Sequence, residues 1–224
     1  MKKVGVLTIG QSPRPDITSD FTQHLSAKVI LVEAGVLNGL SNEYVKEKMR
    51  PNIGDVTYVS RLRDGTQVKL AKNKIIPLMQ KRISQLEEEG VDFIVIFCTG
   101  DFPKFDARVP VVYAGEVLKG FFSGFKCERN VGILVPLEEQ IDYAHEKWKA
   151  YFKNLVVLNA SPYTSTEEDF RKVAEKFRES SAELIIMDCM GYTFNQKRIV
   201  KEYANVPVVS SRSALIKFLD ELLT

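Results

Sequence analysis

Two cysteines stand in similar short contexts and give the strongest chemical signal in the sequence. Cys98 ends the apolar run DFIVIFC and is followed by Thr-Gly, and Cys189 ends the run ELIIMDC and is followed by Met-Gly. A thiol at a strand end just before a helix lies near the positive end of the helix dipole, which favours the thiolate. Free cysteine is also a common small core residue, but the repeated context favours a functional pair.

Two thiols that approach one carbon from opposite faces suit proton-transfer chemistry. One, as thiolate, removes the proton next to a carboxylate, and the other, as thiol, delivers a proton to the opposite face. The negative charge then spreads onto the carboxylate and needs hydrogen-bond donors. Backbone N–H groups at Thr99-Gly100 and Gly191-Tyr192 are candidates for that role.

Polar residues after the first and last strands are further candidates. Gln11 and Ser12 offer donors to a carboxylate, and Arg14 can grip one with two hydrogen bonds. The alternative for Arg14 is an ordinary surface position between two prolines. Residues 210–212 (Ser-Ser-Arg) open the last helix, where they either bind an anion or simply cap the helix.

Three residues around the second cysteine complete the candidate set. Asp188 directly precedes Cys189 in an apolar strand, where its carboxylate either tunes the thiol or serves the structure through hydrogen bonds. Tyr192 and Thr193 lie just beyond the turn and are placed to reach a substrate. For Tyr192 the alternative is that it only forms part of the wall of a cleft that the two cysteines would share.

The elements that must position these residues alternate between short β-branched runs and longer amphipathic stretches. This pattern predicts an α/β fold in which helices flank mostly parallel sheets, with ligand sites at the carboxyl ends of the strands. Besides the two cysteine runs, we expect strands at 4–10, 28–35, 109–113, 130–136, 155–160 and 206–209. We expect helices after Pro15, over 41–50, 73–90 (with the apolar stripe Ile76, Met79, Ile83 and Leu86), 116–125, 137–151 and 166–180, after the second cysteine turn, and in a closing helix to Leu223.

Residues 55–72 depart from this alternation. VTYVSRLR, Asp64-Gly65 and TQVKLAK predict a β-hairpin, and Asp-Gly favours a two-residue type I′ turn. The hairpin is an addition to the α/β framework. Whether it is a structural flap or a lid over a site stays open.

Three segments recur in the same order in both halves of the chain. VGVLTIG at 4 matches VGILVP at 131, the two cysteine runs match each other, and VPVV occurs at 109 and 206. This order indicates an internal duplication that forms two pseudosymmetric lobes. We assign 1–113 plus 206–224 to the first lobe and 114–205 to the second.

Composition excludes several classes of partner. The net charge is only +2 over 224 residues and the basic residues are scattered, so nucleic acid is not an expected partner. No apolar run approaches the ~20 residues that cross a bilayer, and the N-terminal run is predicted to be a strand rather than a targeting signal. We expect a cytoplasmic protein. Three cysteines without a CxxC pair and two histidines predict neither a disulfide framework nor a metal site.

The sequence resembles the AroM family within the Asp/Glu/hydantoin racemase superfamily. The resemblance covers essentially the whole chain and is carried by VGVLTIGQSPRPD, DCMGY and VPVVSSR. It implies two pseudosymmetric α/β lobes with the active site in the cleft between them. It also implies cofactor-independent proton transfer by two cysteines, and Cys98 and Cys189 match those two positions.

The motifs also depart from those of the amino-acid racemases. No His follows Cys189, and the region 10–14 after the first strand has no acidic residue. We therefore expect a cofactor-independent racemase or isomerase, or a lyase or decarboxylase, that acts on a small carboxylated molecule. The alternative is a non-catalytic module that binds a small carboxylate or another anion. A homodimer is one of the assemblies left open.

Overall fold

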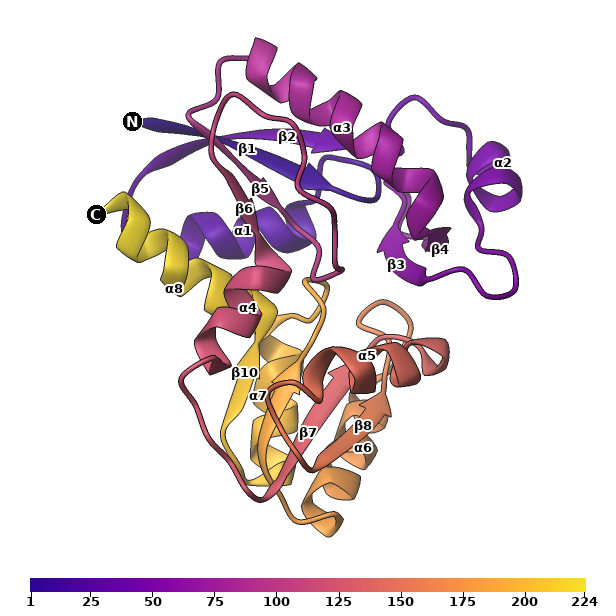
Figure 1. Ribbon diagram of the computed structural model, residues 1–224, viewed down its shortest axis with the longest axis vertical. Helices are drawn as coiled ribbons and strands as arrows, with labels where there is room; N and C mark the ends of the chain where they lie inside the picture. The colour runs from indigo at the N-terminus through magenta and orange to yellow at the C-terminus, as the bar shows by residue number, and fades with distance from the viewer. The chain divides into compact units, whose positions relative to one another are not determined.

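Two four-stranded parallel sheets form the framework of the computed structural model, which describes all residues from 1 to 224 (Figure 1). The first sheet has the order β2-β1-β5-β6, and the second has the equivalent order β8-β7-β9-β10. All neighbouring strands within each sheet are parallel. The strands are β1 (Lys2–Thr8), β2 (Val29–Gly35), β5 (Phe93–Ile96), β6 (Val111–Tyr113), β7 (Asn130–Val135), β8 (Leu155–Asn159), β9 (Ala182–Met187) and β10 (Val208–Ser210). The predicted α/β fold is confirmed.

The three repeated sequence segments occupy equivalent strands in the two sheets. They form β1 and β7, β5 and β9, and β6 and β10. The equivalent strands β1 and β7 each carry a glycine where a side chain of a covering helix comes close. A Cβ at Gly132 would lie 2.6 Å from the Phe177 ring, and one at Gly5 would lie 3.3 Å from Leu86.

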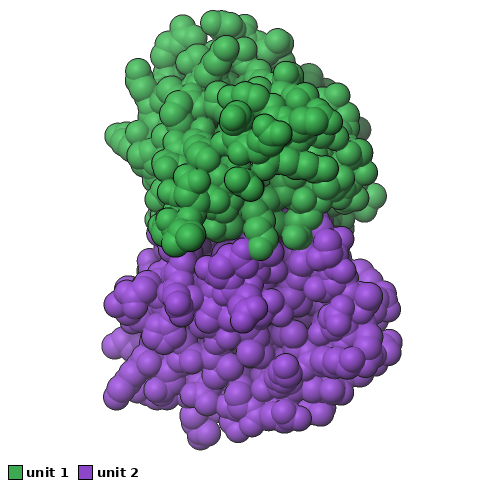
Figure 2. All heavy atoms as spheres, turned by 90° about the vertical axis from the view of Figure 1, so that its right-hand side faces the viewer, with its two compact units in different colours: residues 1–116, 216–224 green, residues 117–215 purple.

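The chain divides into unit 1, residues 1–116 and 216–224, and unit 2, residues 117–215 (Figure 2). The sequence placed the return to the first lobe at residue 206. In the structure, β10 pairs with β9 and so belongs to the second sheet. The crossings between units fall inside two helices, α4 (Ala114–Phe122) and α8 (Ser211–Leu223).

Unit 1 contains α1 (Pro15–His24), the short α2 (Asn42–Tyr44) that continues into a π-helical turn, η1 (Val45–Met49), and α3 (Lys72–Glu88). Pro15 occupies the first turn of α1, as predicted, because it lacks the N–H that would be unpaired there. The buried stripe of α3 is Ile75, Met79, Ile83 and Leu86. The sequence placed Ile76 in this stripe, but it lies about 100° around the helix from Ile75 and is only half-buried.

The predicted hairpin is confirmed as the antiparallel pair β3 (Thr57–Arg61) and β4 (Gln67–Ala71). Its turn differs from the prediction. Leu62 N–H donates to Thr66 O at 2.8 Å, and Gly65 has a positive φ of 93°, whereas Asp64 does not. The loop is therefore a longer turn with glycine at its left-handed position, and the two-residue type I′ turn is wrong.

Unit 2 contains the 3₁₀ turn η2 (Glu138–Gln140), α5 (Ile141–Trp148), α6 (Glu167–Glu179) and α7 (Phe194–Ala204). Both α6 and α7 begin with a reciprocal capping box, in which Thr166 and Thr193 are the N-caps. Trp148 and Phe152 lie at the centre of one buried cluster, and Phe177 and Tyr192 belong to another.

The connections that follow the two cysteines differ between the units. α7 connects β9 to β10, but residues 97–110 connect β5 to β6 without any helix. The helix predicted after the second cysteine turn is confirmed as α7. Cys98 is not followed by a helix, so the expectation that a helix dipole favours its thiolate is wrong for this residue. No helix of the structure is both long and apolar enough to cross a membrane.

Candidate functional site

Both cysteines lie two residues beyond a strand end, at equivalent places in the two sheets. β5 ends at Ile96 before Cys98, and β9 ends at Met187 before Cys189. Both thiols are partly exposed. Each sulfur accepts an N–H from the glycine two residues later, Gly100 N to Cys98 Sγ at 3.5 Å and Gly191 N to Cys189 Sγ at 3.4 Å. The two units thus build the same thiol turn.

These glycine N–H groups have a different orientation from the one the sequence suggested. The sequence assigned Gly100 and Gly191 as donors to a substrate carboxylate, but in the structure their N–H groups point at the cysteine sulfurs. The N–H of Tyr192 likewise donates to Cys189 O at 3.3 Å. Each turn therefore gives its sulfur one backbone N–H donor, which a thiolate accepts readily.

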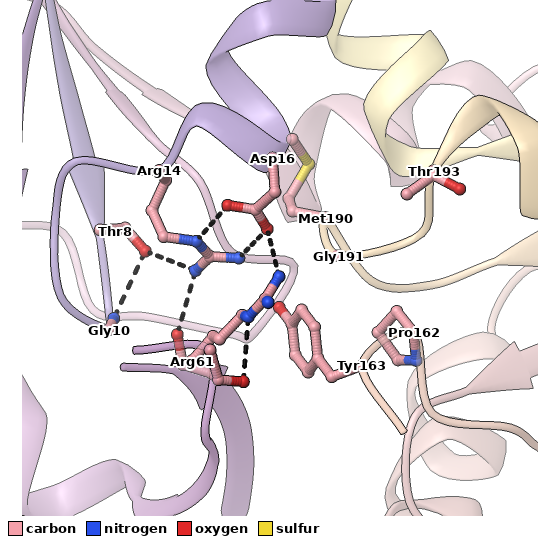
Figure 3. Close-up of polar contacts among 12 residues, drawn as sticks. Thr8, Gly10, Arg14, Asp16, Arg61, Pro162, Tyr163, Met190, Gly191 and Thr193 are labelled. Carbon is pink, nitrogen blue, oxygen red and sulfur yellow. Dashed lines mark hydrogen bonds and ion pairs between the residues drawn. The ribbon is translucent and has the colours of Figure 1, made fainter. Parts of the chain in front are cut away.

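A tyrosine lies against the glycine of each thiol turn and leaves no room for a larger residue. A Cβ at Gly100 would lie 2.5 Å from the Tyr58 ring, and one at Gly191 would lie 2.7 Å from Tyr163 Oη. Tyr58 comes from the hairpin, and its hydroxyl donates to Asp101 O at 3.1 Å. Tyr163 comes from the loop after β8 and is drawn beside Gly191 in Figure 3.

The first turn is closed on its other side by the start of α4. Thr99 is buried, and a Cβ at Gly115 would lie 2.7 Å from Thr99 O. Thr99 therefore packs against the helix that follows β6. Its predicted contact with a substrate stays a prediction.

Arg212 supports the second turn from behind. Its buried guanidinium donates to Met190 O from Nε at 3.2 Å and from Nη2 at 2.9 Å, and Nη2 also donates to Gly191 O at 3.1 Å. The sequence considered the segment 210–212 as an anion site or a helix cap. Here Arg212 fixes the shape of the Cys189 turn, and Ser210 and Ser213 exchange capping hydrogen bonds.

Tyr192 and Thr193 serve the structure around this turn. Tyr192 is completely buried and its hydroxyl donates to Ala160 O at 2.8 Å, so its side chain forms the wall behind the turn. Burial, together with nearby Cys189 and Asp188, raises the pKa of Tyr192, which keeps the hydroxyl protonated. Thr193 Oγ1 accepts the Gln196 N–H as the N-cap of α7.

Asp188 is part of a buried ion pair. Its carboxylate accepts from Lys147 Nζ at 2.8 and 3.0 Å and from Trp148 Nε1 at 2.8 Å, and the Asp188 and Lys147 side chains are both only 4% exposed. Of the two roles the sequence left open, these contacts favour the structural one. They anchor the residue before Cys189 to α5.

In the loop after β1, the predicted carboxylate ligands bind other parts of unit 1. Gln11 Oε1 accepts the Arg63 N–H at 2.8 Å. Ser12 N donates to Asn38 Oδ1 at 2.9 Å, and Asn38 Nδ2 donates to Ser12 Oγ at 2.8 Å. The side chains of Gln11 and Ser12 therefore hold this loop against the hairpin and the β2 loop.

Arg14 already grips a carboxylate of its own chain. Its side chain is 4% exposed, and it binds Asp16 through Nε–Oδ1 and Nη2–Oδ2 contacts, both 2.8 Å long (Figure 3). Its Nη1 also lies 3.4 Å from Thr8 Oγ1. Asp16 thus supplies an acidic group near the end of β1. The region 10–14 has no acidic residue because the carboxylate lies two residues further along, in the first turn of α1.

The sequence did not single out Tyr58 and Tyr163. Each contacts a thiol turn from a distant part of its unit, and no spacing rule connects such positions. The available signal in the sequence was the glycine at the same place in both turns, which indicates that another group packs closely there. No group of three or more His, Cys, Asp or Glu side chains is arranged to hold a metal ion.

Comparison with known proteins identifies the family. The family model described as AroM protein matches residues 4–223. The chain belongs to the AroM family. Among curated proteins, none matches the sequence.

Solved structures similar to this AroM family chain share its fold at low sequence identity. A liganded variant of arylmalonate decarboxylase has a TM-score of 0.61 at 12% identity, covering 100% of this chain and 92% of that chain. Allantoin racemase from Klebsiella pneumoniae has a TM-score of 0.61 at 16% identity, covering 99% and 87%. Glutamate racemase from Aquifex pyrophilus has a TM-score of 0.59 at 16% identity, covering 99% and 84%. The chain shares the fold of these decarboxylase and racemase structures.

Proposed function

We propose that this AroM family chain is a cofactor-independent enzyme of the Asp/Glu racemase type that acts on a small carboxylated substrate. Cys98 and Cys189 are its acid/base pair. The observation that carries the proposal is the matched pair of thiol turns, in which a partly exposed sulfur follows a central strand and accepts a glycine N–H. Core residues have no need of such a repeated, solvent-reaching arrangement.

The proposed chemistry moves one proton off and one proton onto the carbon next to the carboxylate. One sulfur, as thiolate, takes the proton and becomes a thiol, while the electron pair of the C–H bond moves onto the carboxylate. The other sulfur, as thiol, returns a proton to the opposite face and becomes a thiolate. In a decarboxylation, the C–C bond to CO₂ breaks instead and one thiol protonates the carbanion.

Deuterium exchange tests the proposal. The protein is incubated in deuterated water with glutamate, aspartate and phenylmalonate, and the carbon that loses or gains the proton is followed by NMR. We expect deuterium incorporation into at least one compound, and its loss in Cys98→Ser or Cys189→Ser. Cys127→Ser is the matched control, because Cys127 lies in a loop and bonds only to Arg129 O. Exchange that persists in both site variants would exclude the thiol mechanism.

A second test asks whether both thiols reach one substrate. In a Cys127→Ser background, dibromobimane should link Cys98 to Cys189 and produce one fluorescent cross-linked peptide. A prior incubation with the active compound should slow the reaction. If each thiol is labelled singly and no cross-link forms, two-sided proton transfer is wrong.

The alternative is a binding module for a small carboxylate. It is favoured by the connection after Cys98, which has no helix to support a thiolate at that sulfur. For this alternative, a carboxylate should raise the melting temperature equally in wild type, Cys98→Ser and Cys189→Ser, and should be recovered without deuterium. Deuterium incorporation that depends on the thiols excludes it.

A further inference from the structure

Arg61, at the end of β3 in the hairpin, carries a guanidinium with unused donors. Its Nε donates to Gly65 O at 3.0 Å, and its Nη1 lies 3.8 Å from Asp16 Oδ2. Nη1 and Nη2 donate no hydrogen bond, and the side chain is 37% exposed. An arginine whose two terminal nitrogens donate no hydrogen bond is a ready receptor for a planar anion.

The charges around Arg61 leave it incompletely neutralised. Asp16 is the only carboxylate that pairs with it, and Arg14 already binds both oxygens of Asp16 at 2.8 Å (Figure 3). Glu33, the next carboxylate in this region, accepts from Arg14 N at 2.6 Å and from Thr18 Oγ1 at 3.3 Å and makes no ion pair. Two cations thus share the Asp16 carboxylate, and Arg61, the more exposed of the two, has the longer contact with it.

The backbone of Arg61 is fixed to the end of β1. Gln11 N donates to Arg61 O at 3.2 Å, and a Cβ at Gly10 would lie 2.5 Å from Arg61 O and 2.4 Å from Ser60 Oγ. β1 is the neighbour of β5, the strand that leads to Cys98. The hairpin therefore holds Arg61 at the carboxyl edge of the first sheet, where α/β proteins bind ligands.

One strand of the hairpin serves both features of this edge. Tyr58 lies against Gly100 in the Cys98 turn, and Arg61, three residues later in β3, lies beside the loop after β1. This common attachment couples the position of the fork to that of the thiol turn. A flap without a role at the site would not need both contacts.

We propose that Arg61 binds the carboxylate of the substrate through Nη1 and Nη2, and that the hairpin is part of the binding site. This inference rests on the proposed function and names its anionic anchor. Arg14, one of the candidates from the sequence for this role, instead pairs with Asp16 and holds it in place. A fork of this kind also fits phosphate or sulfate, so the experiment must separate these anions from carboxylates.

The test is calorimetric titration of the full-length protein with malonate, and with phosphate in a parallel series. We expect malonate to bind wild type, and Arg61→Gln to weaken it at least tenfold, because a charged bidentate contact is lost. Arg61→Lys keeps the charge without the fork and should weaken malonate severalfold. Arg198→Gln is the control, because Arg198 is an exposed arginine on α7 in unit 2. Circular dichroism and melting temperature establish that each variant is folded.

The outcomes separate this inference from the proposed function. Malonate binding that is lost in Arg61→Gln but kept in the Cys98→Ser, Cys189→Ser double variant supports Arg61 whatever the thiols do. No malonate binding by wild type, or unchanged affinity in Arg61→Gln, would overturn the inference. If Arg61→Gln does not fold, unchanged affinity in Arg61→Lys overturns it. Tighter binding of phosphate than of malonate would overturn the carboxylate assignment.

Discussion

Lys197 in unit 2 is a cation in an unfavourable, half-buried position. Lys197 is a half-buried residue of α7 that makes no ion pair, and its Nζ donates at 2.8 Å to Oγ of Ser213 in the first turn of α8. Burial, and secondarily Lys201, lower the pKa of Lys197. A cation beside a helix N-terminus also opposes the helix dipole. The charged form is therefore disfavoured in the folded state.

Replacing Lys197 should stabilise the protein in a pH-dependent way. Because its folded pKa lies below 10.5, the unfolded state binds more protons between those two pH values, and wild-type stability rises with pH there. We expect Lys197→Met to raise the melting temperature at pH 7 by a few degrees, with a gap that narrows toward pH 10.5. Lys153→Met, at an exposed loop position, is the control. A gap that widens with pH would contradict the assigned direction.

At this scale, sequence reasoning found the residues with distinctive surroundings and missed those defined by contacts. Cys98 and Cys189 were predictable because each ends an apolar run. The pairing of Arg14 with Asp16 was not predictable. It depends on α1 starting at Pro15, which places the Asp16 carboxylate beside the Arg14 guanidinium. Tyr58 was not predictable either, because its partner Gly100 lies 42 residues away in the sequence.

Among the elements, the connection 97–110 shows how a segment without a helix is held in place. α3 binds it at two points. Gln80 exchanges hydrogen bonds with Asp106, at 2.7 and 3.0 Å, and Glu87 accepts from the backbone and side chain of Arg108 and from Val109 N. α3 therefore fixes the segment that begins at the Cys98 turn.

Loss of the Glu87 charge should loosen this segment. Burial raises the pKa of Glu87, but the hydrogen bonds from Arg108 and Val109 outweigh it, and the net shift is downward from 4.5. Its stabilisation is therefore present above pH 4.5 and is lost as the pH falls through the folded value. We expect Glu87→Gln to cost about 1–2 kcal/mol at pH 7, by urea denaturation, and less at pH 3.

Glu88→Gln, at the exposed neighbouring position, is the matched control and should leave the stability unchanged. An equal loss at pH 3 and pH 7 in Glu87→Gln would show that the carboxylate charge is not what holds the connection. Hydrogen exchange of residues 97–110 should rise in Glu87→Gln and not in the control.

The elements themselves were largely predictable, because buried strands and amphipathic helices have strong periodicities. The hairpin was predicted, but its turn type was not, since Asp64-Gly65 suits two turn geometries and only Gly65 takes a positive φ. Because no helix follows Cys98, a helix dipole does not support the thiolate at this residue. Residues 97–110 have no apolar periodicity, so the sequence did indicate a loop there.

On the scale of the whole molecule, the duplication was visible in three matching segments, but the division between units was not. β10 is the next strand after β9 and pairs with it, which assigns β10 to unit 2. The chain then returns to unit 1 within α8. Asp220 binds the backbone and side chain of Ser26 at 2.6 and 3.1 Å.

Removal of residues 216–224 should therefore weaken unit 1 more than unit 2. The deletion removes buried Ile216 and Leu219 together with the Asp220 contacts, and losses of this kind cost about 2–5 kcal/mol for each large apolar side chain. Hydrogen exchange measured by mass spectrometry should show faster exchange in β1, β2 and β5 than in β7 and β9. Equal acceleration in both sheets would contradict the assignment of this segment to unit 1.

The buried contact between Trp148 and Asp188 gives the protein an optical probe of its own. Trp148 is the single tryptophan of the sequence, and its indole N–H donates at 2.8 Å to the residue that precedes Cys189. Indole emission depends on the charge and geometry of such a neighbour. Alkylation of Cys189, or any compound that shifts its turn, should therefore change the intrinsic fluorescence, so unlabelled wild-type protein can be screened against compound libraries.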